Sequence, residues 1–247
     1  MPAASVYSFP TCHADLFYFP EPMQPFQAHF HEWLTAGVLV NGSRCLQSKG
    51  LRAPINAGDL VVIPPRIVHS CAAAEHDCAE WIGIHLRPSP DQAYPDRCHI
   101  LRSPAAVRIA ALLAYAARQP SLDIIRAISS AIAGLFTNLA DRGARTDQDE
   151  HFKMMPASQR PGLEALARES GLKKFQYQRT FRRNTGITPA RCEANIRLNY
   201  AQKLLQGGEE IAASASAFGF CDQAHFSRRF KECVGVTPGQ YRKAWRQ

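Results

Sequence analysis

The sequence contains no apolar run of the roughly 18 residues that a membrane-spanning helix requires. Residues 1–25 hold prolines and scattered aromatic residues, without the basic segment and apolar core of a secretory signal. None of the eight cysteines forms a Cys-x-x-Cys pair, which is the usual spacing of zinc sites and redox motifs. We therefore expect a cytoplasmic protein that has no membrane partner and keeps its cysteines as reduced thiols.

Acidic residues are scarce in the last part of the chain. Residues 152–247 hold 17 Lys and Arg against 7 Asp and Glu, a charge of +10, whereas residues 1–151 hold 12 against 14 and carry −2. The net charge of +8 therefore comes entirely from the C-terminal part of the 247 residues, while eight of the nine histidines lie in the other part. This division favours two domains, and positive charge confined to one of them is typical of a polyanion binder.

The basic part of the chain contains one pattern twice, at an offset of 48 to 49 residues. The first copy reads Ala167-x-x-x-Gly171-Leu172, Gln178-Arg179-x-Phe181, Gly186-Ile187-Thr188-Pro189. The second copy reads Ala215-x-x-x-Gly219-Phe220, Ser227-Arg228-x-Phe230, Gly235-Val236-Thr237-Pro238. Two copies indicate a duplicated module.

Each copy predicts a helix-turn-helix unit. A short helix, over 163–170 or 209–218, ends at a glycine, which tolerates the left-handed backbone of a helix C-terminus. A second helix follows with basic residues on one face, and Gly-[Ile/Val]-Thr-Pro ends it and starts the next helix. A helix over 189–206 joins the two units. This arrangement is typical of a DNA major-groove reader.

The two units resemble the DNA-binding domain of the AraC/XylS family of transcriptional regulators. The resemblance covers residues 159–247 and is carried by Arg197-Leu198-x-x-Ala201-x-x-Leu204-Leu205 and by Gly219-Phe220-x-x-x-x-His225-Phe226-Ser227-Arg228-x-Phe230-Lys231. It implies a sequence-specific regulator of transcription that binds double-stranded DNA as a homodimer, responds to a small-molecule effector and activates through RNA polymerase. It implies no enzymatic activity.

Matching the family's positions residue by residue predicts the DNA contacts. The predicted reading residues are Lys174, Phe175, Gln178 and Arg179 in the first unit, and Gln223, Ala224, His225 and Arg228 in the second. Arg179 suits guanine, Gln178 and Gln223 suit adenine, and the apolar Phe175 and Ala224 suit a thymine methyl group. Lys174 is expected to contact phosphate.

The N-terminal part reads as short strands separated by turns. Strands are predicted over 34–40, before the Asn41-Gly42 turn, over 60–63, and over 81–86. This pattern favours a β-barrel or sandwich.

Two stretches resemble the cupin sensor domains of the same regulator family. They are His29-Phe30-His31 and Gly58-Asp59-Leu60-Val61-Val62-Ile63-Pro64-Pro65-x-x-x-His69. Cupin enzymes carry a glutamate where Thr35 and Ala36 stand here, and usually a glycine at Arg66. His29, His31 and His69 could converge on a metal in the barrel, but they serve better as polar groups that line the pocket of an effector, and we predict that role and no cofactor.

Two alternatives concern metals. His69-Ser70-Cys71 and His76-Asp77-Cys78 repeat a His-x-Cys pattern, which on a hairpin would turn both pairs to one face and suit a soft metal or a redox sensor. Replacing Cys71 and Cys78 by serine would then abolish the response. A cupin enzyme fused to a DNA-binding module is the other alternative, and it requires a stoichiometric metal with an open coordination position.

Two helices are predicted after the strands, over 107–118 and 122–139. In the second, the residues Ile125, Ile128, Ile132, Leu135 and Leu139 step by three and four, as in a heptad seam. The stripe serves either a dimer, which the family resemblance favours, or packing on the barrel. The predicted fold class is thus α+β with two domains: a cupin-like sensor domain over 1–142, a linker over 143–158, and an all-α DNA-binding domain over 159–247 in which a long helix joins the two units.

Overall fold

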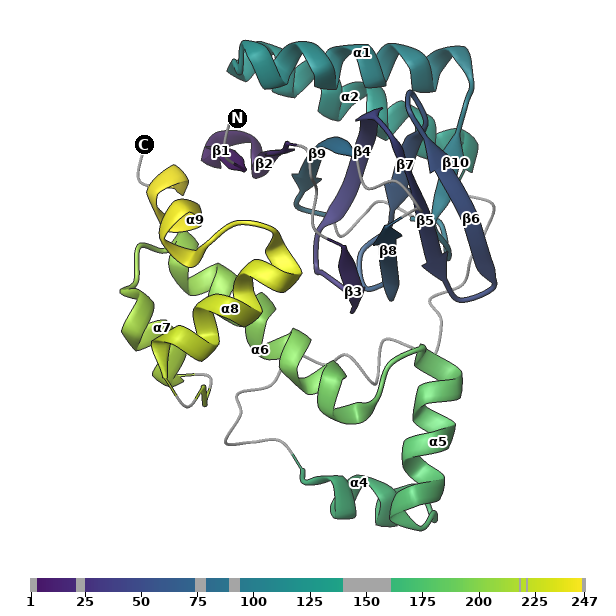
Figure 1. Ribbon diagram of the computed structural model, residues 1–247, viewed down its shortest axis with the longest axis vertical. Coiled ribbons are helices and arrows are strands. Elements are labelled where there is room, and N and C mark those ends of the chain that lie inside the picture. The colour runs from purple at the N-terminus through teal and green to yellow at the C-terminus, as the bar shows by residue number, and fades with distance from the viewer. Residues whose placement is uncertain are drawn as a thin grey trace.

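The structure is a computed structural model that describes residues 4–20, 25–73, 79–88, 94–139, 161–217, 219–220 and 222–245. Its N-terminal part is a β domain covered by two helices, and its C-terminal part is entirely helical (Figure 1). This confirms the predicted fold class. The predicted linker, residues 143–158, lies outside the described residues.

The β domain consists of two antiparallel sheets that enclose an apolar interior. One has the strand order β1-β2-β9-β4-β7-β10, and the other has the order β3-β8-β5-β6. Their bounds are β1 Ser5–Phe9, β2 Ala14–Phe19, β3 Phe26–His29, β4 Leu34–Asn41, β5 Ser43–Ser48, β6 Leu51–Asn56, β7 Leu60–Ile63, β8 His69–Ala73, β9 Glu80–Leu86 and β10 His99–Leu101.

The six-stranded sheet is buried on both faces. Along β9, Ile82 and Ile84 point to one face, where they pack under two helices, α1 (Pro104–Arg118) and α2 (Leu122–Leu139). Trp81 points to the other face, into the space between the sheets. Burial on both faces explains why β4, β7 and β9 have nearly continuous apolar sequences, from which these strands were predicted. The strands β1 and β2 were not predicted, although β2 contains the apolar run Leu16-Phe17-Tyr18-Phe19, which is as long as the run in β7.

The heptad-like stripe of α2 packs against its own domain. Ile125, Ile128 and Ile132 are fully buried and Leu135 is 9% exposed, in one cluster with α1 and the outer face of the sheet. Leu139 ends the helix, and its side chain is outside the described part. The four buried side chains are therefore covered by their own domain and are not free to form the dimer seam for which they were predicted. Apolar residues spaced by three and four suit packing on the barrel as well as packing across a dimer, so the sequence alone did not distinguish these two arrangements.

The C-terminal domain contains the duplicated module as predicted. Its helices are α4 Leu163–Glu169, α5 Lys174–Thr185, α6 Pro189–Gln206, α7 Ile211–Ala217, α8 Gln223–Val234 and α9 Pro238–Trp245. The glycines after α5 and α8, Gly186 and Gly235, have φ values of 85° and 88°. The Thr188 hydroxyl accepts a hydrogen bond from the Arg191 amide at the start of α6, and Pro189 occupies the first turn.

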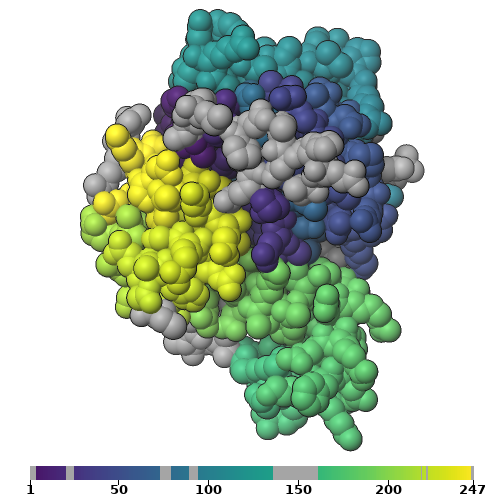
Figure 2. All heavy atoms as spheres, in the orientation of Figure 1, coloured from purple at the N-terminus to yellow at the C-terminus, as the bar shows by residue number. Residues whose placement is uncertain are grey.

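The helical domain is docked on the β domain. Figure 2 shows the C-terminal helices, in yellow, lying against the N-terminal strands, in purple, while the first helix-turn-helix unit, in green, projects from the body. One apolar cluster joins Phe17 and Phe19 of β2 to Phe230 and Tyr241 of α8 and α9. The Tyr241 hydroxyl also donates a hydrogen bond of 2.9 Å to the Asp15 carboxylate, and both side chains are buried. The two domains thus share a core.

Candidate functional site

The helix α5 presents its predicted reading residues to solvent. Phe175 is 75% exposed, Lys174 and Arg179 are exposed, and Gln178 is partly exposed. Tyr177 and Phe181 of the same helix face inward and fill the core of the first unit. Lys174 also forms an ion pair with Glu164 of α4, with 2.5 Å between Nζ and Oε1. The exposed face of α5 is therefore open to a DNA groove.

The helix α8 presents the matching residues of the second unit. Asp222 caps its N-terminus by accepting a hydrogen bond of 2.6 Å from the His225 amide. Gln223, Ala224 and Arg228 are exposed, whereas His225 is partly buried, with its ring 5.7 Å from that of Phe220. Six of the eight predicted residues are thus exposed, and Gln178 and His225 are partly exposed.

Four histidines meet in a cavity between the sheets. They are His29, His31, His69 and His85, and most other residues around them are apolar. Strand pairing explains their convergence, because His29 lies opposite His69 across β3 and β8, and Thr35 lies opposite His85 across β4 and β9. The cavity has a volume of about 70 Å³, which holds several water-sized groups.

The rings of three of these histidines are held by backbone carbonyl groups. The Nδ1 atom of His29 lies 2.7 Å from the Gln27 oxygen, that of His31 lies 2.7 Å from the Trp33 oxygen, and that of His69 lies 2.9 Å from the Ile67 oxygen. A carbonyl oxygen only accepts, so each Nδ1 carries the proton and each Nε2 keeps a lone pair.

All four imidazoles are neutral at pH 7. Burial, together with the nearby charge of Arg191, lowers the pKa of His29 to about 4, and burial, together with the neighbouring His29 and His69, lowers the pKa of His85 to about 3. Burial and the neighbouring histidines hold the pKa values of His31 and His69 well below the usual 6.5. A protonated ring here would be a desolvated charge beside other imidazoles, and the pKa values fall for that reason.

The imidazole nitrogens that line the cavity fit a metal ion, and the cupin resemblance implies a metal for enzymes of that fold. The ligand nitrogens of His29, His31 and His69 all lie within 4.8 Å of one another. Thr35, which stands at the position of the cupin glutamate, places its hydroxyl 3.1 Å from Nε2 of His31. Among the described lining residues there is no carboxylate, so any ion would be held by neutral nitrogens.

The His-x-Cys pattern is described only in part. His69 and Cys71 both line the cavity, from the same face of β8. His76 and Cys78 lie outside the described residues, so the second pair of that prediction stays untested.

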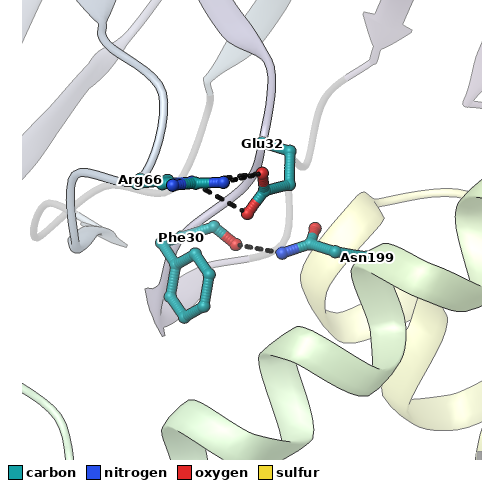
Figure 3. A network of polar contacts seen from close by, with 4 residues as sticks. All are labelled: Phe30, Glu32, Arg66 and Asn199. Carbon is teal, nitrogen blue, oxygen red and sulfur yellow. Dashed lines mark hydrogen bonds and ion pairs between the residues drawn. The ribbon is translucent and has the colours of Figure 1, made fainter. Parts of the chain in front are cut away.

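The DNA-binding domain forms part of the cavity wall. Cys233 and Val234, at the end of α8, are among its lining residues. Beside it, the Phe30 amide donates to Oδ1 of Asn195 on α6 at 3.1 Å, and Nδ2 of Asn199 donates to the Phe30 oxygen at 3.5 Å (Figure 3). The residue between His29 and His31 is thus bound through both backbone groups to the helix that joins the two readers.

A second polar contact fixes the same loop from the barrel side. Arg66 forms an ion pair of 3.0 Å with Glu32 (Figure 3). Its amide also donates to the His31 oxygen at 2.8 Å. Arg66 has a φ value of 63°, which explains why cupins usually have glycine there. The ion pair helps to hold this strained residue in place.

Several functional residues had no clear signal in the sequence. His85 was detectable only as an inward position two residues from Gly83 on a strand whose register was unknown. Asn195, Asn199 and the pair of Asp15 with Tyr241 act across the domain interface, at sequence separations from 165 to 226 residues. No local pattern reports such contacts.

Comparisons with known proteins agree with this architecture. A family model described as a helix-turn-helix domain matches residues 166–244, and one described as an AraC-like ligand binding domain matches residues 15–152. In the described part of the chain, no helix combines the length and apolar character needed to cross a bilayer.

Among curated proteins, the chain is 25% identical over 238 residues to the uncharacterized HTH-type transcriptional regulator YbfI of Bacillus subtilis, and the match covers 87% of this chain and 86% of YbfI. It is 34% identical over 86 residues to the MmsAB operon regulatory protein of Pseudomonas aeruginosa, and that match covers 34% of this chain and 28% of that protein. Both matches are to proteins named as regulators.

Among solved structures, unsaturated fatty acid-bound ToxT from Vibrio cholerae matches with a TM-score of 0.58 and 13% identity, over 98% of this chain and 97% of that one. At this identity the likeness shows the shared fold alone. The ligand-binding family model spans more than half of the sequence, and the helix-turn-helix model follows it in the order that the structure shows. The chain therefore belongs to the AraC family of DNA-binding transcriptional regulators.

Proposed function

We propose that this regulator binds a small-molecule effector in the histidine-lined cavity, and that the effector controls how the DNA-binding domain docks on the barrel. The observation that carries the proposal is the composition of the cavity wall. Residues of the barrel line it together with Cys233 and Val234 of α8. A molecule bound there contacts both domains in the docked state and loses its contacts with α8 when the domains separate. The effector therefore binds the docked state more tightly than the separated state, and it stabilises docking by the difference between the two binding free energies.

Docking matters for DNA binding because both reading helices must enter the major groove together. Successive grooves on one face of DNA are about 34 Å apart. The joining helix α6 has 18 residues and, at about 1.5 Å per residue, spans roughly 27 Å, so the units must tilt or the DNA must bend. In the docked state, α6 and α8 contact β3, and Phe30 packs into the core of the first unit. Release from the barrel gives both units freedom to adjust.

The proposed DNA contacts are those of the exposed helix faces. Arg179 pairs with a guanine edge, and Gln178 and Gln223 pair with adenine. Phe175 and Ala224 contact thymine methyl groups, while Lys174 neutralises a phosphate. His225 and Arg228 complete the second reader.

The remaining parts of the proposal come from the family. Homodimerisation and activation through RNA polymerase are common properties of AraC-type regulators, and a partner that is chromosomal DNA implies a cytoplasmic location. A dimer of this chain must use a surface other than the buried stripe of α2. ToxT from Vibrio cholerae, with an unsaturated fatty acid bound, is a precedent for a small apolar effector in this fold.

The test is DNA selection followed by titration. Duplexes enriched from a randomised pool are titrated with the wild-type chain, with Arg179→Ala, and with Arg108→Ala as a charge-matched control on the exposed face of α1. We expect Arg179→Ala to weaken binding by about 1 to 3 kcal/mol and to relax the preference at one base pair, with no change for Arg108→Ala. Failure to enrich any sequence, or equal effects of the two variants, would contradict the proposal.

A further inference from the structure

We propose that His29, His31 and His69 form a binding site for one divalent transition-metal ion, with His85 as a further nitrogen beside it. The proposal deepens the regulatory role proposed above, because the ion would sit in the same cavity, but metal binding itself does not depend on that role.

The first argument is the orientation of the donors. Each of the three rings is 5 to 7% exposed, and each directs its Nδ1 proton to a backbone carbonyl group. This fixes the tautomer whose Nε2 lone pair is available, and metal-binding histidines are commonly fixed in this way by a second hydrogen bond. The closest ring centroids are 4.3 Å apart, between His29 and His69, and 4.9 Å apart, between His31 and His69.

The second argument is the distance between the nitrogens. They lie within 4.8 Å of one another, whereas two nitrogens bound to one zinc ion at about 2.0–2.1 Å in tetrahedral geometry are roughly 3.3 Å apart. Closing that difference needs the rings to move toward one another, and the backbones of His29 and His69 are already paired across β3 and β8. The Thr35 hydroxyl, now 3.1 Å from Nε2 of His31, would give up that contact to the ion.

The third argument is an unsatisfied polar atom. Nδ1 of His85 is buried and has no hydrogen-bond partner in the part of the chain that the structure describes. Its ring centroid lies 5.2 Å from that of His31, and its ring lines the same cavity. A buried nitrogen without a partner is unfavourable. A coordinated ion, or a water bound to that ion, would give this nitrogen a role.

The donor set selects the class of metal. Neutral imidazole nitrogens suit Zn²⁺, Ni²⁺, Co²⁺, Cu²⁺ and Fe²⁺, whereas Mg²⁺ and Ca²⁺ prefer carboxylate oxygens, which the described cavity lining lacks. Three neutral ligands leave the ion's two positive charges uncompensated in a mostly apolar cavity. We therefore expect the open position to take an anion, which in the regulator would be hydroxide or a carboxylate of the effector.

The position of Phe30 connects such an ion to the DNA-binding domain. His29 and His31 would be drawn together by the ion, and Phe30 between them is bound by Asn195 and Asn199 of α6. Its side chain lies in the core of the first helix-turn-helix unit. A change in the spacing of the two histidines therefore reaches α6 through one residue.

The test uses the untagged full-length chain, stripped with a chelator and dialysed against Zn²⁺ or Co²⁺. We expect one ion per chain by elemental analysis, a higher melting temperature with Zn²⁺, and visible Co²⁺ absorption bands of nitrogen ligation. Mg²⁺ should have no effect. Less than about 0.2 ions per chain after dialysis against a slight excess of Zn²⁺ would overturn the site, given the affinities of protein zinc sites.

Variants then assign the ligands. His29→Gln and His69→Gln should weaken binding by more than the roughly 10- to 100-fold that loss of an outer-shell partner causes. The control is His99→Gln on β10, which is outside the cavity lining and should bind as the wild type does. Circular dichroism checks that each variant is folded. Unchanged Zn²⁺ affinity in both folded ligand variants would overturn the assignment.

DNA titration with and without Zn²⁺ separates this inference from the proposed function. Stoichiometric binding together with a change in DNA affinity supports both. Absence of metal binding in a chain that still selects specific DNA overturns the metal site alone. Stoichiometric binding without any change in DNA affinity confirms the site and overturns its regulatory part.

Discussion

Asn199 on the helix that joins the two reading units donates a hydrogen bond to the carbonyl oxygen of Phe30, the residue between two cavity histidines (Figure 3). Asn195, one turn earlier, accepts from the Phe30 amide. The Phe30 ring packs with Tyr177 and Phe181 of the first unit. The Phe30 segment therefore links the histidine-lined cavity to the DNA-binding domain, beside the direct contribution of Cys233 and Val234 to the cavity wall, and this link has testable consequences.

Removal of the two amides should loosen the docked state. Asn195→Ala with Asn199→Ala removes two hydrogen bonds between Phe30 and α6, which we expect to weaken docking by about 1 to 3 kcal/mol. Small-angle scattering should show a larger radius of gyration, and selected DNA should bind more tightly. Lys203→Ala, at an exposed position on the same helix, is the control. A compact double variant with wild-type DNA affinity would contradict the link.

The duplication provides a matched pair of glycines for a second test. Gly186 and Gly235 end α5 and α8 with the same left-handed backbone, so alanine at either position causes similar strain. A Cβ atom at Gly235 would lie 2.4 Å from the Phe19 ring of the barrel, whereas at Gly186 the nearest neighbour is a Val68 methyl at 3.5 Å. We expect Gly235→Ala to separate the domains, measured by limited proteolysis and scattering, and Gly186→Ala to leave them docked.

Asp15 should make docking depend on pH. Burial raises its pKa to about 6, while hydrogen bonds from Ser8 and Tyr241 act in the opposite direction. A raised pKa means that the docked state binds a proton which the exposed carboxyl, with its ordinary value of 3.8, does not. The contribution of the Asp15 carboxyl to the stability of the docked state is therefore fully present below pH 3.8 and is lost as the pH rises through 6.

Between pH 5 and pH 7.5 we expect the wild-type chain to lose roughly 1 to 2 kcal/mol of stability from this group, measured by urea unfolding. Asp15→Asn keeps the size of the side chain and cannot ionise, so it should remove that slope of unfolding free energy against pH. Asp96→Asn, at an exposed position, should retain it. Equal slopes in all three chains would show that Asp15 does not titrate in this range.

The two kinds of DNA contact should respond differently to salt. Lys174→Ala is expected to weaken binding about equally for all sequences and to reduce the slope of log affinity against log salt concentration by about 1. Gln223→Ala should leave that slope unchanged and should relax the preference at one base pair. Fluorescence anisotropy at several salt concentrations measures both. Identical salt slopes for Lys174→Ala and the wild type would show that Lys174 makes no phosphate contact.

The elements that the sequence predicted best are those with local boundary signals. The helix α6 has the predicted bounds because Thr188 caps it and Pro189 starts it, both within a few residues. The repeated glycines likewise marked the ends of α5 and α8. Strands β4, β7 and β9 were found because burial on both faces makes their sequences mostly apolar.

The rest depended on register and on contacts between domains. His29 and His69 meet because β3 pairs with β8 in one register, and a shift by one residue would turn either ring away. His85 joins them from the opposite sheet. The stripe of α2 has a period that fits a barrel surface as well as a dimer. Asn199 reaches Phe30 across 169 residues, which no single sequence indicates.

Hydrogen exchange at the Phe30 segment tests the central claim most directly. In the docked chain its amide is buried and bonded to Asn195, so peptides that cover residues 26–34 should exchange slowly. If release from the barrel accompanies DNA binding, selected DNA should speed exchange there and in β1, which packs on α9, while α5 becomes protected. Unchanged or slower exchange at residues 26–34 in the DNA complex would show that the docked domains read DNA as they stand, and it would contradict control by release from the barrel.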